Sequence, residues 1–564
     1  MAARRHLRVL GVAGSLAVGG TFAAMDAQTD ASQRRARASP LARRPGAAPV
    51  AGEPMFSKDE VAQCDGIDGA PAWVTYRGGV YDVSDFRLIH PGGHIIAQAA
   101  GGDVSPFWDV WAYHHYAPKV GEYLVQLRIG ALKGAAAEAE ERIMGRGSGD
   151  DPYEAEPVRA HAAQTVFLER PYCSETRSAA LGESYLTPAD ALYVRNHAPV
   201  PECAWPPEGS SSAVYAQQHE VCFDGAVPAE ARTAVDSSTV EPAEAEEEAE
   251  EETSVFTVAE LEARFGIVTV TSILQCAGNR ASEDIAATGP SGFSGSPFER
   301  ITHGMVGNAQ WGGVRLADIL PALYPAACAA VRRHGGGEWH VVFEGADGYA
   351  ASSPLARVLA QKNDCLLATR MNGEPLSPDH GYPVRALLPG VAGARNVKWL
   401  HSISLQRRPV DAPWNAYYYK NAKAEQIQEL PLQSRIVATS ECPDAKSRAA
   451  ASLESVVEVS GVAYSGGSGN AIARVEISTN DGESWADATM HVAEVKEDGS
   501  HSHFGWVRWS ATIPIQPASA ERRKRTSICC RATDAEGNTQ CEAPAKERGY
   551  VFNGWSKVRV VTRQ

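Results

Sequence analysis

Residues 274–280 read LQCAGNR and place one cysteine, Cys276, between a run of β-branched residues and a turn of small residues. A thiolate is a nucleophile and also a soft ligand for thiophilic metals. Most lone cysteines, however, are buried and inert. Taken alone, the stretch leaves three interpretations open: a packed thiol, a nucleophile or a metal ligand.

Basic residues gather in two other stretches. Residues 381–410 hold five Lys or Arg and no acid, and His380 precedes them. The earlier segment YVRNHAPVP adds Arg195, Asn196 and His197. Arginines and histidines with interspersed glycines suit a phosphate-bearing organic ligand. A thiolate near such a pocket fits a thiophilic metal that is carried by a phosphorylated cofactor.

Surface decoration is the plainer interpretation of these basic residues. It suits Arg407 and Arg408. It suits Arg385, Arg395 and Lys398 less well, because they stand in an apolar, glycine-rich setting.

Two histidine motifs lie in the N-terminal part of the chain. One is His90-Pro91-Gly92-Gly93, and the other is YHHY with His114 and His115. Histidines this far apart do not share one helical face, but from two loops they could hold a haem iron on both axial sides. The pair alone is weak support, because two ordinary surface or core histidines would look the same.

Length and composition limit the fold and the partners. A chain of 564 residues is too long for one core and predicts about two to four domains. Apolar content of 44% and charged content of 21% are typical of a soluble globular protein. The net charge of −15 argues against nucleic acid and favours a basic protein partner. The eleven cysteines include no C-x-x-C pair, which argues against a disulfide framework or a zinc site.

The N-terminus resembles a targeting segment. Residues 1–25 contain Arg4, Arg5 and Arg8 and no acid before Asp26, and more arginines follow. An arginine-rich, acid-poor start is typical of a mitochondrial presequence, with a secretory signal as the alternative. The apolar run after it is too short and too rich in Gly and Ala to predict a stable membrane span.

The elements that position these residues divide the chain into parts. WVTYRGGVYDV predicts a hairpin around Arg77-Gly78-Gly79, within a small α+β unit over 54–133. Residues 134–165 have the composition of a hinge linker. A mixed α/β region covers 166–432, interrupted by a glutamate-rich run over 241–252 that reads as a solvated loop. From 433 to 564 alternation such as ARVEIST and the turn Asn480-Asp481-Gly482 predict an immunoglobulin-like β-sandwich.

The N-terminal motifs together resemble the cytochrome b5-like haem domain over about 80 residues. They are FSKDEVAQC, WVTYRGGVYDVSDF, HPGG, AAGGDVSPFW, YHHY and VGEYLVQLRIGAL. The resemblance implies a b-type haem held by His90 and His114. Counting from His90 instead leaves His115 as the alternative second ligand. A bis-histidine iron has no open position, so this unit should move single electrons.

The later motifs resemble the eukaryotic sulfite oxidase and assimilatory nitrate reductase family, in the same order along the chain. They include LYVRNHAPVP, LQCAGNR, NAQWGGVRL, FEGADGYAASSPLA, GYPVRALLPGVAGARNVKWL and IQELPLQS. The resemblance implies an α+β multidomain protein with a molybdopterin domain over 166–432 and a dimerisation domain over 433–564. It also implies a homodimer and two cofactors, Mo-molybdopterin and haem b. Residues 1–53 would be presequence and an unstructured segment.

The same resemblance implies roles for individual residues. Cys276 would ligate molybdenum. Tyr419, Arg195 and Arg548 would line the substrate pocket. The pterin cofactor would be held by Tyr193, Val194, Arg195, Asn196, His197, Asp347, His380, Arg385, Asn396, Val397 and Lys398.

A haem domain that precedes the molybdenum domain, together with Arg548, implies sulfite rather than nitrate as the substrate. Electrons would pass to the haem and then to basic cytochrome c in the mitochondrial intermembrane space, without stable membrane insertion. Two alternatives are another oxyanion such as nitrate, and a haem electron carrier with a degenerate molybdenum domain. Intact Cys276 argues against the second.

Two positions depart from the sulfite enzymes. Those enzymes carry an arginine where this chain has Ala281 and a tryptophan where it has Ile301. Either the substrate has changed, or a neighbouring cation replaces the missing charge. Arg300 is the first candidate for that cation, and Arg280 is the second.

Overall fold

The structure is a computed structural model. It describes residues 53–67, 69–88, 90, 96, 99–110, 114, 118–133, 153, 156–159, 161–207, 209–225, 253–289, 296–334, 339–360, 363–416, 418–421, 423–441, 455–491, 504–515, 525–544 and 550–561. The expected presequence, His115, the acidic run 241–252 and Arg548 lie outside these ranges.

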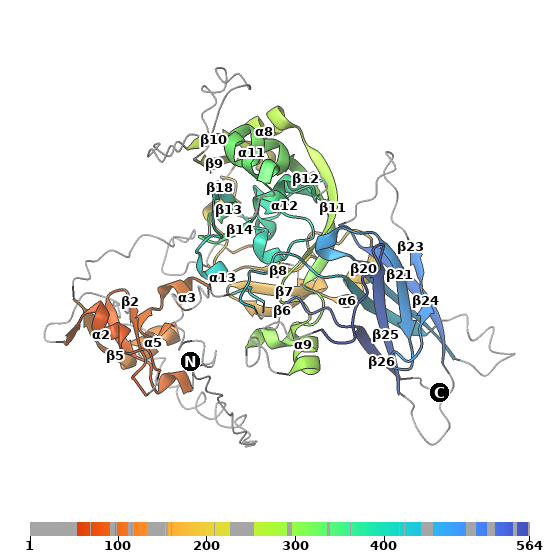
Figure 1. The fold of residues 1–564 in the computed structure, drawn as a ribbon, viewed down its shortest axis with the longest axis horizontal. Helices are drawn as coiled ribbons and strands as arrows, with labels where there is room; N and C mark the ends of the chain where they lie inside the picture. Colours follow the sequence, from red (N-terminus) through yellow and green to blue (C-terminus); the bar gives the residue numbers. More distant parts are fainter. Residues whose placement is uncertain are drawn as a thin grey trace.

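The N-terminal unit is built on a five-stranded sheet, drawn in red and orange in Figure 1. The predicted hairpin is confirmed, because β2 (Trp73–Tyr76) pairs with β3 (Gly79–Asp82) across a turn in which Arg77 and Gly78 both have positive φ. The sheet order is β1-β5-β3-β2-β4, with β1 (Met55–Phe56), β4 (Gly102–Asp103) and β5 (Arg128–Leu132).

Helices cover this small sheet. A capping box of Ser57 and Glu60 starts helix α2, in which the Glu60 carboxylate accepts from the Ser57 backbone N–H. The core of the unit includes Val74, Tyr81 and Trp108. The helices are α2 (Lys58–Ala62), α3 (Ser105–Val110) and α5 (Pro118–Leu127).

The central unit holds three sheets. The run of β-branched residues before Cys276 forms β11 (Val268–Gln275), which pairs antiparallel with β12 (Val306–Arg315) along its whole length. The other two strands of that sheet are β15 (Leu366–Met371) and β16 (Glu374–Pro375), and β17 (Arg385–Leu387) pairs with β15.

The central unit has two further sheets. One has the order β10-β9-β18-β13-β14, with β9 (Glu220–Asp224), β10 (Ser254–Thr257), β13 (His340–Gly345), β14 (Ala350–Pro354) and β18 (Leu400–Gln406). The other has three strands, β6 (Gln164–Glu169), β7 (Tyr172–Thr176) and β8 (Val194–Arg195).

Short helices connect and cover these sheets. Leu316, Ile319 and Leu320 of α10 are fully buried in the largest core, which explains why this apolar segment is helical and packed inward. The helices are α6 (Ser178–Glu183), α7 (Ser212–Gln218), α8 (Val258–Phe265), α9 (Ala281–Thr288), α10 (Leu316–Leu323), α11 (Pro325–His334), α12 (Leu355–Leu359) and α13 (Pro413–Ala416). Short 3-10 helices are η6 (Pro297–Arg300), η8 (Pro378–His380) and η9 (Gly393–Arg395).

The C-terminal unit is all-β, as predicted. Its two four-stranded sheets have the orders β19-β20-β24-β23 and β22-β21-β25-β26. Both sheets contribute to one core, which includes Val459, Val475 and Trp509, so the unit is a sandwich. The strands are β19 (Gln433–Glu441), β20 (Ser455–Tyr464), β21 (Ile472–Ser478), β22 (Ala486–Asp487), β23 (Thr489–His491), β24 (Val507–Ile515), β25 (Arg525–Asp534) and β26 (Ser556–Val561).

The alternation expected in ARVEIST holds only in part. Val475 and Ile477 are buried as predicted, but Ala473 is exposed and Glu476 is buried. The Glu476 carboxylate accepts from Arg531 Nε at 2.8 Å, which compensates its burial. The turn at Asp481 and Gly482 has positive φ at both residues, as expected.

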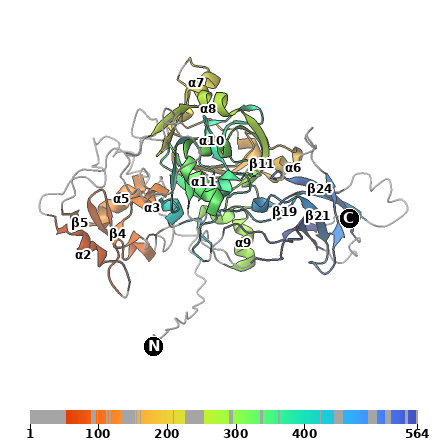
Figure 2. The ribbon, with the colours of Figure 1, turned by 45° about the horizontal axis from the view of Figure 1, so that its top comes forward.

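The N-terminal and the C-terminal units both contact the central unit. Val437, Val462, Tyr464 and Trp506 of the C-terminal unit belong to the same core cluster as the central unit. On the other side, α3 of the N-terminal unit lies beside α13 of the central unit, as Figures 1 and 2 show. In the described ranges no helix has the length and apolar character to cross a membrane.

The expected linker ends in residues that are held in place. Arg159 donates to both carboxylate oxygens of Asp379, at 2.8 and 2.7 Å, and its guanidinium lies 3.9 Å from the ring centre of Tyr172. Strand β6 then begins at Gln164. Contacts with the central unit therefore begin before residue 166.

Candidate functional site

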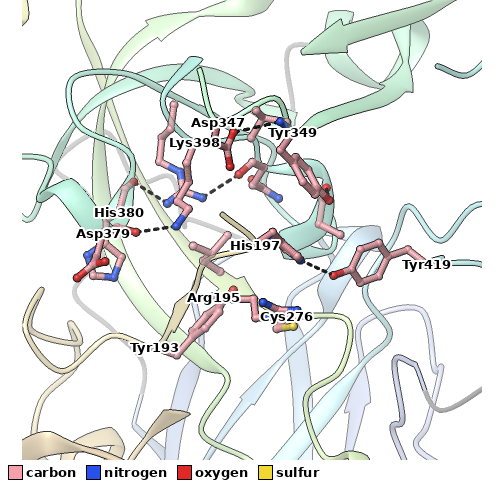
Figure 3. A pocket seen from close by; sticks show the side chains of 16 residues that line it. Tyr193, Arg195, His197, Cys276, Asp347, Tyr349, Asp379, His380, Lys398 and Tyr419 are labelled. Atoms are coloured by element: carbon pink, nitrogen blue, oxygen red, sulfur yellow. Dashed lines mark hydrogen bonds between the residues drawn. The ribbon is translucent and has the colours of Figure 1, made fainter. Parts of the chain in front are cut away.

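One pocket gathers most of the residues singled out in the sequence. Figure 3 shows their side chains around it, with Lys398 and Asp347 on one side and Cys276 and Tyr193 on the other. Of the predicted residues it is lined by Tyr193, Arg195, His197, Cys276, Asp347, His380, Arg385, Asn396, Val397, Lys398 and Tyr419. It is also lined by Leu274, Tyr349, Asp379, Gly393 and Ala394, which the sequence analysis did not single out.

Cys276 lies where β11 ends and the chain turns. Its backbone N–H donates to Met305 O at 3.0 Å, and its Sγ accepts from the Gly278 N–H at 3.4 Å. Burial raises the pKa of the Cys276 thiol, while the Gly278 hydrogen bond and the charge of Arg195 act in the opposite direction. Cys276 is 9% exposed and lines the pocket, so its thiol is fixed in position and a ligand in the pocket can reach it.

The opposite side of the pocket is basic and buried. The Arg385 guanidinium donates to the carbonyls of His380 and Asn396 at 2.9 and 3.0 Å, and burial lowers the pKa of Arg385 to about 10. Lys398 Nζ donates to Asn196 Oδ1 and to Asp379 O, and burial also lowers the pKa of Lys398. One buried and one partly buried cation, whose donors go mostly to neutral oxygens, favour an anionic ligand.

Nearby titratable groups reinforce this preference. Burial lowers the pKa of His380 to about 4, so its ring is neutral near pH 7. Its Nδ1 is bonded to Ser377 Oγ at 2.7 Å, and its Nε2 has no hydrogen-bond partner in the part of the chain that the structure describes. Burial raises the pKa of the Asp347 carboxyl, whose Oδ1 accepts from the Tyr349 N–H.

The Asp379 carboxylate does not neutralise the cations of the basic side, because both of its oxygens accept hydrogen bonds from Arg159. Burial alone would raise the pKa of Asp379, but the hydrogen bonds and charge of Arg159 hold it below its ordinary value. Asn196 Nδ2 also donates to Asp379 Oδ1 at 3.1 Å. The sequence contained no signal for this pair, since 220 positions separate its members.

A different set of groups surrounds the thiol side. Arg195 is half-buried, and His197 Nε2 and Tyr419 Oη are 3.1 Å apart. Burial lowers the pKa of His197 well below its ordinary value, so the neutral ring can accept the tyrosine proton in this bond. The ring centre of Trp414 lies 3.9 Å from that of His197, and Tyr550 lies 5.3 Å from Tyr419. The thiol side is therefore aromatic with Arg195 as its lining cation among the described residues.

Two of the residues predicted to hold the cofactor do not line the pocket but are buried behind its wall. Val194 is buried in β8, and Asn196 is buried with its amide bonded to Asp379 and Lys398. Asn196 therefore orients two groups of the basic side instead of lining the cavity.

The two atypical positions are filled by apolar packing. Ala281 is 0% exposed and Ile301 is 2% exposed, and both belong to the core cluster that contains Cys276 and Phe298. The structure does not favour Arg300 as a replacement cation, because it is exposed on η6 and is not among the residues that line the pocket. Arg280 is fully buried and bonded to residues of the C-terminal unit, so it too lies outside the pocket.

The N-terminal unit brings its two candidate haem ligands close together. The ring centres of His90 and His114 are 6.1 Å apart with an interplanar angle of 30°. Two metal–imidazole bonds of about 2 Å, with the half-width of each ring added, would put axial ring centres roughly 6 Å apart. The Trp108 ring stacks at 5.6 Å from His114, and Phe86 lies 5.6 Å from His90. The distance between the two ring centres is compatible with one iron held by His90 and His114, and His115 lies outside the described residues.

Both donor sets suit the expected cofactors. The pocket combines a reachable thiol with a buried basic side, which fits a thiophilic metal on a phosphate-bearing organic group. Within the described ranges, no cluster of three or more His, Cys, Asp or Glu side chains able to hold a metal occurs.

Three family descriptions match successive parts of the chain. Residues 57–133 match a cytochrome b5-like heme/steroid binding domain. Residues 244–414 match an oxidoreductase molybdopterin binding domain, and residues 424–563 match a Mo-co oxidoreductase dimerisation domain.

Relatives match over most of the chain. Mitochondrial sulfite oxidase of Drosophila melanogaster is 33% identical over 532 residues, covering 90% of this chain and 81% of the relative. The human mitochondrial sulfite oxidase is 32% identical over 529 residues, covering 90% of this chain and 84% of the relative. Nitrate reductase [NADH] of Ulva prolifera is 30% identical over 396 residues, but these span 66% of this chain and 40% of the relative.

Proposed function

This chain belongs to the sulfite oxidase family, and on that premise we propose that it oxidises sulfite to sulfate and passes the electrons through a b-type haem to cytochrome c. The observation that carries the proposal is the placement of Cys276. Its thiol faces a pocket whose opposite side holds Arg385 and Lys398.

In this proposal the pocket holds Mo-molybdopterin. Cys276 ligates the metal, while Arg385, Lys398 and His380 hold the phosphate and pterin groups, with Asn196 keeping Lys398 in position. Tyr193, Asp347, Asn396 and Val397 would complete the cradle, and Val194 packs behind it. When bound, the molybdenum centre supplies an oxygen atom and accepts two electrons.

The thiol side binds the substrate. The Arg195 guanidinium would attract the sulfite oxyanion to the thiol side of the pocket. Arg548, assigned on the family resemblance, would add a second cation there. Tyr419 lines the aromatic side and points its hydroxyl at His197.

The N-terminal unit carries the haem between His90 and His114. The position of α3 beside α13 supports direct electron transfer, since α3 carries Trp108 next to His114 and α13 carries Trp414 next to His197. Two electrons would leave the molybdenum site one at a time, because a haem iron accepts only one.

Further features support the partners. The net charge of −15 would steer basic cytochrome c toward the protein. The match of residues 424–563 to a dimerisation domain supports a homodimer through the C-terminal sandwich, which we take to be immunoglobulin-like. Mitochondrial relatives and the arginine-rich start support the mitochondrial intermembrane space. The proposed domain bounds are 54–133, 166–432 and 433–564, and the Arg159 contacts and strand β6 extend the central unit toward the linker.

The two alternatives are less well supported. A degenerate molybdenum domain would have lost its pocket, whereas here eleven of the predicted residues line one. A nitrate-reducing activity rests on a relative that matches less of this chain.

Purified protein, assayed for molybdenum and haem, tests the proposal with sulfite as donor and cytochrome c as acceptor. We expect sulfite-dependent reduction of cytochrome c. Molybdenum-loaded protein that reduces nitrate with an artificial donor but ignores sulfite would overturn it.

A further inference from the structure

Arg280 is the most heavily bonded side chain near Cys276 that the proposed chemistry does not use. It is 0% exposed, and its backbone is left-handed, with φ of 69°. Its NH1 donates to Gln433 Oε1 at 3.0 Å and to Gly554 O at 2.7 Å. Its NH2 donates to Glu283 at 2.6 Å and to Trp555 O at 3.2 Å. Gln433, Gly554 and Trp555 all belong to the C-terminal unit.

Two further bonds join the same turn to the C-terminal unit. Tyr464 Oη donates to Gln275 Oε1, and the Val551 N–H donates to Ala277 O at 2.7 Å. Residues on both sides of Cys276 are thus held by one neighbouring unit, at positions 275, 277 and 280. The thiol itself accepts a hydrogen bond from the Gly278 N–H, within its own turn.

The Arg280 bonds are costly to replace. A non-glycine residue in the left-handed region is strained and persists only where surrounding contacts hold it there. The planar guanidinium reaches two carbonyls and a carboxylate at once, which an ammonium group cannot reproduce. Glu283 lies near a second buried arginine, Arg435, at 3.7 Å, and the charges of both arginines lower the pKa of Glu283 although burial opposes this.

We propose that Arg280 is a positioning residue, which lets the C-terminal unit set the orientation of the Cys276 thiol. We call the bonds from the C-terminal unit to residues 275, 277 and 280 the clamp. The inference rests on the proposed role of Cys276 as the metal ligand, but the clamp itself is a property of the folded chain. It means that docking of the C-terminal unit and competence of the thiol site are coupled. Loosening that contact should disturb Cys276 before it disturbs the basic side of the pocket.

The chain offers a matched control. Arg357 of α12 also joins the central unit to the C-terminal one, through Gly467 O at 3.5 Å, and it bonds Glu429 and Pro389 O as well. It lies outside the pocket lining. Substituting Arg357 weakens the same boundary at a point that does not touch the Cys276 turn.

The test uses the full chain without molybdenum cofactor and follows alkylation of Cys276 by iodoacetamide, with mass spectrometry of the peptides. Cys328, which is 1% exposed, reports general opening in the same digest. We expect Arg280→Lys to speed Cys276 alkylation at least about tenfold relative to Cys328. Arg357→Gln should change this ratio by less than about twofold.

A second variant covers the case in which Arg280→Lys does not fold. Glu283 is partly exposed, so Glu283→Gln should fold, and removing its charge should speed Cys276 alkylation at least about threefold. Hydrogen exchange at residues 276–281 should rise in both Arg280 and Glu283 variants. The proposal is overturned if the folded variants alkylate Cys276 as slowly as the wild type, or no faster than Arg357→Gln.

Neither readout needs molybdenum, haem or sulfite. A failed clamp would therefore leave the proposed sulfite oxidation standing. Conversely, protein that does not oxidise sulfite could still show the clamp.

Discussion

The guanidinium carbon of Arg195 lies 4.9 Å from the centre of the Phe298 ring. Phe298 is 3% exposed and sits in the 3-10 helix η6, three residues before Ile301. Phe298 and Ile301 belong to the same buried cluster as Cys276, so an aromatic ring at 298 lies near the position where, by the family resemblance, the sulfite enzymes carry a tryptophan. We interpret Phe298 as the ring that supports the Arg195 guanidinium beside the pocket.

Phe298→Leu should therefore weaken sulfite binding more than turnover. A cation–π contact of this kind contributes about 0.5–2 kcal/mol, so KM for sulfite should rise by roughly 2–30-fold with kcat little changed. Phe298→Tyr keeps the ring and should stay within about twofold of the wild type. Steady-state assays with ferricyanide measure both, and equal KM values for the Leu variant and the wild type would refute the assignment.

Arg300→Ala should leave the sulfite KM within about twofold, because this side chain is exposed and outside the pocket lining. Ala281→Arg should destabilise the protein instead of tightening binding, because position 281 is fully buried among apolar side chains. The assay pairs sulfite kinetics with thermal unfolding. A tenfold rise in KM for Arg300→Ala would restore it as the compensating cation.

His114→Ala and His90→Ala should each abolish cytochrome c reduction, because the haem is lost or loses an axial ligand. Sulfite-dependent reduction of ferricyanide should persist, since Cys276 and its pocket lie in another unit. His115→Ala is the matched neighbour and should keep the low-spin haem spectrum. If His115→Ala loses that spectrum and His114→Ala keeps it, His115 is the ligand.

Cofactor-free protein should lose stability as pH falls from about 6.5 to about 4. The pKa of His380 is lowered from 6.5 to about 4 by burial, so in this range the unfolded chain binds a proton that the folded chain does not. At about pH 5.5 this effect costs about 1 kcal/mol, and it vanishes above the unfolded pKa. Urea unfolding at two pH values measures it, and His380→Gln should flatten the dependence. An unchanged slope in that variant would contradict the assignment.

Sequence motifs predicted much of the pocket because its residues stand in short, ordered segments such as LQCAGNR and YVRNH. The hairpin at Arg77-Gly78 and the all-β C-terminal unit were also predictable, since turn residues and local alternation determine them. Glu476 was predicted to be solvent-facing, and its burial depends on Arg531, which lies on another strand.

Contacts between distant positions could not be predicted. Arg159 and Asp379 are 220 positions apart in the sequence, and neither segment contains a pattern that predicts their ion pair. Arg280 was the second candidate in the sequence for a cation that binds the substrate anion. Its left-handed backbone instead places it against the C-terminal unit. Phe298, in the 3-10 helix η6, could not be singled out because its partner, Arg195, lies far away in the sequence, on strand β8.

The most direct test of sulfite oxidation at the Cys276 pocket is haem reduction by sulfite in purified, molybdenum-loaded protein without oxygen. A thiolate is a softer and better ligand for this metal than the hydroxyl that replaces it in Cys276→Ser. Sulfite should reduce the haem of the wild type, and the haem of Cys276→Ser should stay oxidised although its spectrum is intact. Reduction of the variant's haem at the wild-type rate, or no reduction in loaded wild type, would contradict the account.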